Sequence, residues 1–377
     1  MGPAALDGIS VVDFSRVLAG PLVGMTLGDL GADVVKVEAP GGDDTRRWLP
    51  PSDAQGRASY HHAANRNKRS VALDLDRAPD LALARQLCER ADVVVSNFKP
   101  GTLERFGLDY ATVSSESSQV VYCEISGFGE QGGRDMPGYD PLVQALGGLM
   151  SITGPPEGEP QKVGVALVDV LAGLFSTVGI LAALRHRDTT GEGQRVEVNL
   201  LSSLLAALVN QGSAYTAGGK VPTRMGNQHP SIAPYELLRT GDGDLVLAVG
   251  NDRQFASLCE VVGEPALSTD PRFAVNASRV AHRVELRDAL ERVLSTQSAP
   301  TWATALTAAG VPAGVVNDMA TAFRLAADLG LEPVVDVPRP DGTTVALTRN
   351  PIGMSATPPV YRSAPPRLGR HRIDAHS

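Results

Sequence analysis

The first 130 residues alternate between two hydrophobic periods. Five short apolar runs rich in β-branched residues predict strands, and they lie at 9–14, 33–38, 70–75, 93–98 and 120–126. Apolar residues at helical spacing predict helices over 22–30 and 79–91, and Gly31 stands where a helix commonly ends. Because the strand runs are almost continuously apolar, we expect a parallel sheet with both faces covered. This half of the chain therefore predicts a doubly wound α/β domain.

The rest of the chain predicts a second, smaller unit. A glycine-rich region over 127–154 precedes an expected helix over 169–186, and residues 195–208 have the pattern of a strand followed by a helix. A polar, glycine-rich connector around Gly218 marks a domain boundary. The later expected elements are a strand at 245–249, helices at 254–262, 284–295 and 302–309, and a tail at 332–347 with β character around a Pro-Asp-Gly turn.

The composition is that of a soluble globular chain. Of 377 residues 43% are hydrophobic, and a net charge of −8 argues against sequence-independent nucleic-acid binding, which needs a basic face. The cysteines Cys88, Cys123 and Cys259 are far apart, which argues against a disulfide framework and a zinc site. No secretory signal is apparent, and the apolar stretch at 170–184 is short for a membrane span. We therefore expect a cytoplasmic protein with no metal and no membrane or nucleic-acid partner.

The strand–turn–helix opening raises the hypothesis of a dinucleotide site. The turn from Leu18 to Gly24 has only two of the fingerprint glycines, and Glu38 alone is weak evidence for a ribose contact, so we expect no NAD. The helix that begins near Pro21 can still hold an anion. Basic residues on nearby loops suit a ligand with several phosphates as a group, although each alone is more typical of a solvated loop: Arg46, Arg47, Arg66, Lys68, Arg69, Lys99 and Arg105.

Asp169 is the only charged residue between Val163 and Leu184. A carboxylate in so apolar a segment is costly if it is buried without a partner. Its position directly before Val170 is typical of a helix N-cap, which would satisfy helix N–H groups. A helix start can also hold a carboxylate ionised in a cleft, where it is a competent nucleophile towards a thioester. The local sequence leaves both interpretations open.

A series of short motifs runs along nearly the whole chain: Leu6-Asp7-Gly8-Ile9, residues 14–21, residues 27–38, Asn67-Lys68-Arg69-Ser70, Asn97-Phe98-Lys99-Pro100-Gly101, residues 125–129, Gly138-Tyr139-Asp140 and residues 191–194. Each fragment alone is weak, but the ordered set is specific. It resembles the class III CoA-transferases of the CaiB/BaiF type. This family includes formyl-CoA transferase and carnitine CoA-transferase, and α-methylacyl-CoA racemase is a relative.

The resemblance implies an architecture beyond what the hydrophobic pattern predicts. Two chains would thread through each other as an interlocked-ring homodimer. The large domain, with its Rossmann-like CoA-binding part, would cover residues 1–195 and be followed by a linker at 196–225. A smaller α+β domain would cover 226–315, and a tail at 316–377 would return to the large domain. The boundary near Gly218 agrees with this division.

The resemblance also implies roles for single residues. Asp169 matches the aspartate that becomes covalently acylated. The implied contacts with CoA are Val17, Leu18, Ala19, Leu73, Asn97, Phe98, Lys99 and Arg105. The implied contacts with the acyl group or the acceptor acid are Trp48, Tyr60, Tyr139 and Asp140.

We therefore expect an enzyme that moves CoA from an acyl-CoA to an acceptor carboxylate through an aspartyl anhydride and an aspartyl–CoA thioester, without a metal or redox cofactor. The racemase reaction is the nearest alternative, but Tyr139 stands where racemases have a histidine, and a phenol is a poor base. His61, His62 and His229 are more typical of surface or core histidines. A non-catalytic acyl-CoA-binding protein is the second alternative, against which the retained Asp169 argues.

Three features depart from the family pattern. Ala39 replaces a basic residue that often faces the adenine. The segment Gly226-Asn227-Gln228-His229 stands in the region of the glycine run of formyl-CoA transferase, and the usual C-terminal helix is cut short after Gly369. We therefore expect the adenine contact and the cover over the intermediate to differ from those of formyl-CoA transferase.

Overall fold

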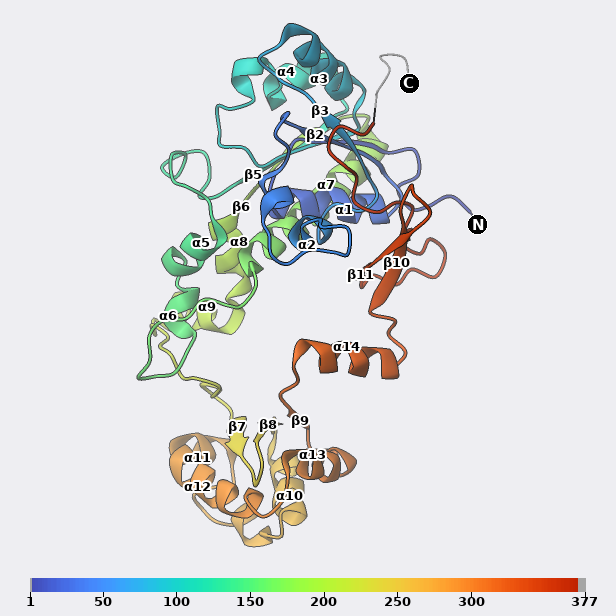
Figure 1. Ribbon diagram of the computed structural model, residues 1–377. Coiled ribbons are helices and arrows are strands. Elements are labelled where there is room, and N and C mark those ends of the chain that lie inside the picture. The colour runs from blue at the N-terminus through green and yellow to red at the C-terminus, as the bar shows by residue number, and fades with distance from the viewer. Residues whose placement is uncertain (1, 372–377) are drawn as a thin grey trace. The chain divides into compact units, whose positions relative to one another are not determined.

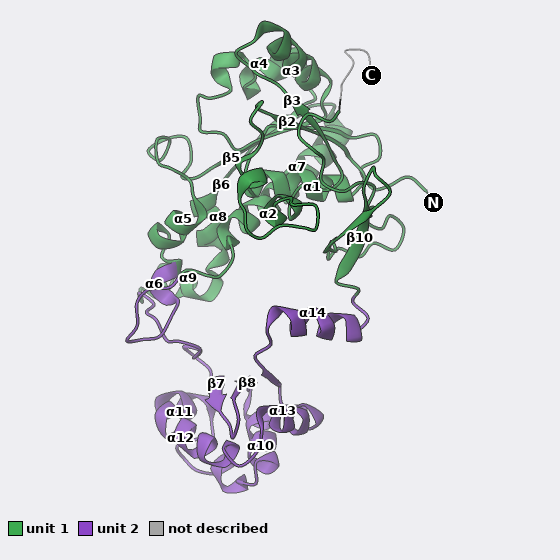
Figure 2. Cartoon of the chain, in the orientation of Figure 1, with its two compact units in different colours: residues 1–149, 162–220, 332–377 green, residues 150–161, 221–331 purple. Residues whose placement is uncertain are grey.

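The computed structural model describes residues 2–371, and residues 1 and 372–377 lie outside this description (Figure 1). The chain divides into two compact units (Figure 2). The first unit comprises Met1–Leu149, Lys162–Lys220 and Glu332–Ser377, and the second comprises Met150–Gln161 and Val221–Leu331. Residues 196–220, most of the expected linker, thus belong to the first unit, and the expected small domain at 226–315 lies wholly in the second.

The first unit is built on a six-stranded parallel sheet (Figure 1). The strand order is β3-β2-β1-β4-β5-β6, so the chain reverses direction across the sheet between β1 and β4. The doubly wound parallel sheet expected from the apolar runs is confirmed, with boundaries shifted by a few residues. The strands are β1 (Ser10–Asp13), β2 (Asp33–Glu38), β3 (Lys68–Ala72), β4 (Val93–Ser96), β5 (Val121–Ser126) and β6 (Gln194–Asn199).

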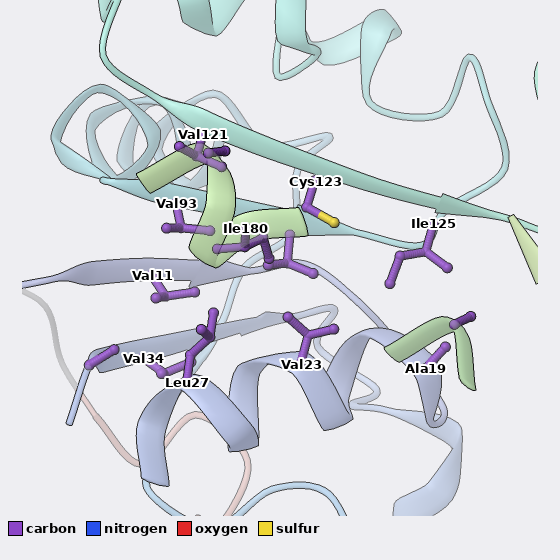
Figure 3. Packing of buried hydrophobic residues seen from close by; sticks show 14 of the residues in the cluster. Val11, Ala19, Val23, Leu27, Val34, Val93, Val121, Cys123, Ile125 and Ile180 are labelled. Atoms are coloured by element: carbon purple, nitrogen blue, oxygen red, sulfur yellow. The ribbon is translucent and has the colours of Figure 1, made fainter. Parts of the chain in front are cut away.

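Buried side chains cover both faces of this sheet. Val11 of β1 packs on one face with Val23 of α1 and Ile180 of α7 (Figure 3). Its neighbour Val12 packs on the other face, in a cluster that includes Cys88 of α3. The helices and 3₁₀ turns of the first unit are α1 (Ala19–Asp29), η1 (Asp44–Arg47), α2 (Ser59–His62), α3 (Ala78–Arg90), η2 (Glu104–Phe106), α4 (Tyr110–Glu116), α5 (Asp140–Leu146), α7 (Leu167–Thr190), α8 (Leu200–Ala207) and α9 (Val209–Thr216). The short helix α6 (Leu149–Ile152) begins at the end of this unit, and its residues from Met150 on belong to the second unit (Figure 2).

The C-terminal tail completes the first unit. It forms an antiparallel pair, β10 (Val334–Pro338) and β11 (Thr344–Thr348), around the expected turn. The chain beyond this pair bonds to the end of α1, where the Val360 N–H donates to the Asp29 carbonyl at 2.7 Å. The Asp29 carboxylate is itself buried and pairs with Arg66 at 2.5 Å. The tail is therefore part of the folded unit that carries the sheet.

The second unit has a three-stranded antiparallel sheet and its own core. Arg279 is fully buried in this unit, where its guanidinium donates to the carbonyls of Ala233 and Phe273 at 2.7 and 2.9 Å. The elements are β7 (Tyr235–Arg239), β8 (Asp244–Ala248), α10 (Asp252–Val261), η3 (Pro265–Ser268), α11 (Asn276–Ala281), α12 (Arg283–Leu294), α13 (Ala299–Ala308), β9 (Ala313–Val315) and α14 (Met319–Asp328). The pattern missed β7, β9, α11 and α14.

One helix among the described residues, α7, is long and apolar enough by length and composition to cross a membrane. A buried core helix passes the same test. Ala172, Ile180 and Ala183 of α7 lie in the core beside the sheet, as expected of a core helix. The helix runs from Leu167 to Thr190, longer at both ends than the expected range of 169–186.

Candidate active site

A cavity of about 550 Å³ lies in the first unit, bordered by the loops that follow β1, β4 and β5. These loops leave the carboxyl ends of the strands on either side of the reversal in strand order, where ligands bind in open α/β sheets. Ten of the thirteen site residues expected from the sequence line this cavity: Val17, Leu18, Ala19, Trp48, Asn97, Phe98, Lys99, Tyr139, Asp140 and Asp169.

Val17 has a strained backbone in the loop after β1. Its φ of 67° lies in the left-handed region, which is unusual for a β-branched residue. The Val17 N–H donates to the Asp43 carboxylate at 3.2 Å, and the Lys36 ammonium pairs with the same carboxylate at 3.1 Å. Burial alone would raise the pKa of Asp43, but Lys36 and the hydrogen bonds from Thr45 outweigh burial and lower it to about 2. Asp43 is therefore a fixed anion that holds the strained loop.

A second buried charge pair supports the same loop. The Lys68 ammonium donates to the Asp13 carboxylate at 2.9 Å and to the Pro21 carbonyl at 2.7 Å. Burial lowers the pKa of Lys68 to about 8, against the opposing effect of Asp13. Ser15 lies between the two pairs: its N–H donates to Asp13 at 2.9 Å, and its carbonyl accepts from Lys36 at 2.7 Å. Removal of one charge would leave its partner buried and unpaired, so this network is rigidly specified.

Asn97 joins the loop after β4 to the loop after β1. Its amide oxygen accepts from the Arg16 N–H at 2.7 Å, and its amide nitrogen donates to the Arg16 carbonyl at 2.7 Å. The Arg16 guanidinium lies over the Phe98 ring, 5.3 Å from its centroid. Asn97 thus acts on the shape of the cavity by holding the backbone of Arg16.

Residues 127–138 form a loop that closes on itself at a glycine neck. A Cβ on Gly127 would lie 2.5 Å from the Cα of Gly138, and a Cβ on Gly138 would lie 2.6 Å from the Cα of Gly127. No side chain fits at either position, so the neck needs two glycines. Tyr139 follows the neck directly and is 65% exposed. Lys99 pairs with Asp135 at 2.9 Å and so connects this loop to the one after β4.

Asp140 is buried at the start of α5 and caps the neighbouring helix α7. Its Oδ2 accepts from the backbone N–H of Val168 at 2.7 Å and of Asp169 at 3.3 Å, and its Oδ1 accepts from Gln144 at 2.5 Å. Because α7 begins at Leu167, Asp169 lies within its first turn and makes no capping bond. The interpretation of Asp169 as an N-cap is therefore wrong, and the capping carboxylate is that of Asp140.

The Asp169 carboxylate lines the cavity and, among the described residues, accepts no hydrogen bond. Burial, and then the negative charge of Asp140, raise the pKa of Asp169 to about 7. Such a carboxylate is ionised above neutral pH and is more basic than an exposed one. Both of its oxygens are free to react, as a nucleophile requires.

Trp48 and Tyr60 form an aromatic wall beside Asp169. Trp48 lines the cavity, and the Tyr60 ring packs against it edge-on with the centroids 4.9 Å apart. Tyr60 lies behind Trp48 and does not itself line the cavity. Burial, and then the carboxylates of Asp169 and Asp140, raise the pKa of Tyr60. The phenol is therefore within electrostatic reach of both carboxylates.

Two expected CoA contacts lie elsewhere. Leu73 is buried in the hydrophobic cluster that α3 forms with one face of the parallel sheet, and its N–H donates to the Glu38 carbonyl. Arg105 is exposed, 3.4 Å from Asp76 and stacked over the Phe106 ring. Neither side chain lines the cavity described above, and their contacts with CoA stay predictions.

A neighbouring cavity, of about 440 Å³, shares six lining residues with the active-site cavity, among them Phe98 and Lys99. Three of its carboxylates, from Glu124, Glu130 and Glu197, lie within 4.8 Å of one another, which is close enough to hold a metal ion. The Arg195 guanidinium pairs with all three. These glutamates therefore form an ion-pair network with a cation that the chain itself supplies.

Sequence reasoning missed the residues that support the site. Lys36 could have been recognised from the sequence, since a charge inside the apolar run at 33–38 must be paired if the strand is buried. Asp43 and Gln144 could not have been recognised, because the fold and not their spacing in the sequence determines their partners. Arg16 and Arg134, the two guanidinium groups that line the cavity, were also not singled out.

Comparisons with known proteins identify the family of this chain. The model of CoA-transferase family III matches residues 6–372. A succinate–glutarate CoA-transferase of Agrobacterium fabrum is 45% identical over 374 residues, which are 97% of this chain and 94% of that protein. A succinyl-CoA:glutarate CoA-transferase of Mus musculus is 37% identical over 368 residues, which are 97% of this chain and 84% of that protein.

A solved structure is similar over almost the same length. The crystal structure of a CaiB/BaiF family protein from Brucella suis has 43% sequence identity and a TM-score of 0.87. The match covers 98% of this chain and 98% of that one.

Proposed function

Since this chain belongs to CoA-transferase family III and moves coenzyme A between an acyl-CoA and a carboxylate, we propose that Asp169 is the covalent nucleophile and that both acids are dicarboxylic acids. The observation that carries the first part is the Asp169 carboxylate itself. It lines the cavity, accepts no hydrogen bond within the described chain, and has a pKa raised to about 7 by burial and by Asp140.

The proposed reaction proceeds through two half-transfers. Asp169 attacks the thioester carbonyl of the donor, the carbon–sulfur bond breaks, and an aspartyl anhydride and the CoA thiolate form. The thiolate then attacks the aspartyl carbonyl, which gives an aspartyl–CoA thioester and releases the donor acid with one oxygen from Asp169. The acceptor carboxylate attacks this thioester and repeats the steps in reverse. Atoms and charge balance without a metal or redox partner.

Asp140 supports this chemistry in two ways. By capping α7 it fixes the turn that carries Asp169, with a bond of 2.7 Å from the Val168 N–H. Its charge also opposes ionisation of Asp169, which keeps the nucleophile basic. We therefore assign Asp140 a positioning role, in place of the direct contact with the acyl group implied by the resemblance.

Two observations favour dicarboxylic acids. The relatives from Agrobacterium fabrum and Mus musculus are named for succinate or succinyl-CoA and glutarate. The cavity is also lined by two guanidinium groups, Arg16 and Arg134, and a guanidinium group binds a second carboxylate in a fork geometry. Arg134 has no ion-pair partner among the described residues, so it is the better candidate for this contact.

A CoA-exchange screen tests both parts. Succinyl-CoA is offered with acceptors of increasing length and with matched monocarboxylic acids, and products are read by mass spectrometry. We expect exchange with glutarate and with isotopically labelled succinate, at least tenfold less with butyrate and valerate, and none in Asp169→Ala. Arg134→Ala should lose the preference for dicarboxylic acids and keep activity with monocarboxylic acids. Full activity of Asp169→Ala would refute the nucleophile, and an unchanged preference in Arg134→Ala would refute that contact.

We further propose a homodimer of the interlocked kind, located in the cytoplasm and not in a membrane. Apolar side chains that the isolated chain leaves exposed support the dimer: Leu174, Phe175 and Val178 of α7 and Leu205 of α8. Light scattering on the purified protein should give twice the mass of the chain. A monomer at micromolar concentration would contradict this proposal.

A further inference from the structure

Residues 44–62 border two different cavities. Asp44 and Trp48 line the active-site cavity. Arg46, which lies between them in sequence, lines a different cavity of about 350 Å³ in the same unit. Residues 55–58, His61 and His62 complete the near side of this second cavity, and residues 365–368 of the tail close its far side.

The second cavity carries positive charge that the chain leaves unpaired. Arg46 pairs with Glu38 at 2.6 Å, so its charge is matched. No ion pair among the described residues matches Arg57 or Arg367, although both line the cavity. Burial, and then the charges of Arg339 and Arg367, lower the pKa of Arg57, against the opposing effect of Asp53 and Asp341. Repulsion from the other guanidinium groups thus outweighs the attraction of these carboxylates.

Two buried histidines add unpartnered ring nitrogens to the same place. The Nε2 of His61 and the Nδ1 of His62 have no hydrogen-bond partner, and each residue is 5% exposed. The Nε2–H of His62 donates to Asp53 at 2.9 Å and leaves its Nδ1 as an acceptor. Burial, and then Arg46 and Lys36, lower the pKa of His61 to about 3, so its ring is neutral and can donate through its Nε2. Buried polar groups are nearly always bonded, so these nitrogens point to a bound group.

From these residues we propose that the second cavity is a binding site for a small dianion with carboxylate or phosphate oxygens, held between Arg57 and Arg367 with the Nε2–H of His61 as a further donor. Two guanidinium groups match two negative charges, and their planar donors suit both kinds of oxygen. Pro365, Pro366 and Leu368 supply an apolar side that accommodates a short carbon chain. The site is separate from Asp169 and does not depend on the reaction proposed above.

Calorimetry on the CoA-saturated protein tests this site, because we expect CoA to reduce binding of other anions in the active-site cavity, and the variants below separate the two cavities. Inorganic phosphate and glutarate are titrated separately into the wild type, Arg57→Ala, Arg367→Ala and the control Arg77→Ala. Arg77 is an exposed arginine of the same unit that lines none of the cavities described here. We expect at least one of the two anions to bind, and each cavity variant to weaken that binding by about tenfold or more, as loss of a charge-assisted hydrogen bond does. Arg77→Ala should bind as the wild type does.

The two titrations distinguish the source of the anion. Binding of phosphate alone identifies a phosphate site, and binding of glutarate alone identifies a carboxylate site. If neither anion binds the wild type, or if both cavity variants bind as the wild type does, the proposal is overturned. Arg367 is exposed, so its variant is expected to fold even if Arg57→Ala does not.

Discussion

At the scale of single residues, the reactivity of the site depends on two carboxylates that play opposite parts. Asp140 accepts three hydrogen bonds from the protein, whereas Asp169 accepts none among the described residues. Burial, and then the charge of the bonded carboxylate, raise the pKa of the free one. Asp140 lines the active-site cavity, but it acts through the helix that carries the nucleophile.

The pH dependence of the reaction should follow this pair. Only ionised Asp169 attacks, so kcat/KM for the donor should rise with pH through an apparent pKa near 7. Asp140→Asn keeps an oxygen for the helix cap but removes the charge, so this pKa should fall by about one unit. A pH profile of both proteins measures the shift. An unchanged profile in Asp140→Asn would show that Asp140 does not tune the nucleophile.

The same pKa predicts a pH-dependent stability. An ordinary Asp ionises near 3.8 and folded Asp169 near 7, so between these values the folded state holds the extra proton and stability falls as pH rises. Asp169→Asn removes this penalty. The difference in unfolding free energy between the variant and the wild type should therefore grow by about 2 kcal/mol in favour of the variant as the pH rises from 5 to 8. Denaturant unfolding at both pH values measures the difference, and a gain independent of pH would exclude the raised pKa.

At the scale of elements, the site is made by loops that the sheet positions and buried charges hold in place. The loop after β1 keeps Val17 in a left-handed conformation through the bond from its N–H to Asp43. Such strain costs of order 1 kcal/mol and persists only because the surroundings fix it. It indicates that the fold gives up some stability to set the backbone of Val17, Leu18 and Ala19.

Val17→Gly tests whether this strain has a purpose. Glycine adopts the left-handed region freely, so the variant should be more stable by up to about 1 kcal/mol. Its loop should also be less ordered, and KM for acyl-CoA should rise several-fold with a smaller change in kcat. Val17→Thr keeps the β-branch and should match the wild type in stability. Loss of stability in Val17→Gly would contradict the strain.

The glycine neck gives a second prediction for a loop. Gly138→Ala places a Cβ within 2.6 Å of the Gly127 backbone and should force the neck open. Because Tyr139 and Asp140 follow directly, kcat/KM should fall at least tenfold and the melting temperature should drop. Gly132→Ala is the matched control in the same loop, since nothing lies within 4 Å of its added Cβ. Equal activities of the two variants would show that the neck does not position Asp140.

The sequence predicts those elements whose signal is local. β1 and β4 were found because their runs are almost continuously apolar, and β2 was predicted with its observed bounds of 33–38. β7 was missed although its residues Glu236 and Leu238 are buried, because a buried Glu breaks the apolar pattern. The cap on α7 was also missed. Asp140 lies 28 residues before Val168, and only the fold brings them together.

At the scale of the whole molecule, the first unit contains every residue of the proposed chemistry. The tail and the N-terminal part of the chain are joined there by the bonds that reach Asp29 from Arg66, Asn350 and Val360. The family match over residues 6–372 spans both units, so the second unit is also part of the family's fold. The central claim is nevertheless local: one carboxylate exchanges its oxygens with both acids.

That claim is tested most directly by the fate of oxygen in the protein. After turnover with an acceptor acid labelled with oxygen-18, trypsin in ordinary water releases residues 163–185, a peptide in which Asp169 is the only acidic side chain. The neighbouring peptide, residues 135–162, contains Asp140 and serves as the internal control. We predict heavy oxygen in the first peptide and none in the second. Label in the Asp140 peptide, or an unlabelled Asp169 peptide after many turnovers, would contradict the mechanism.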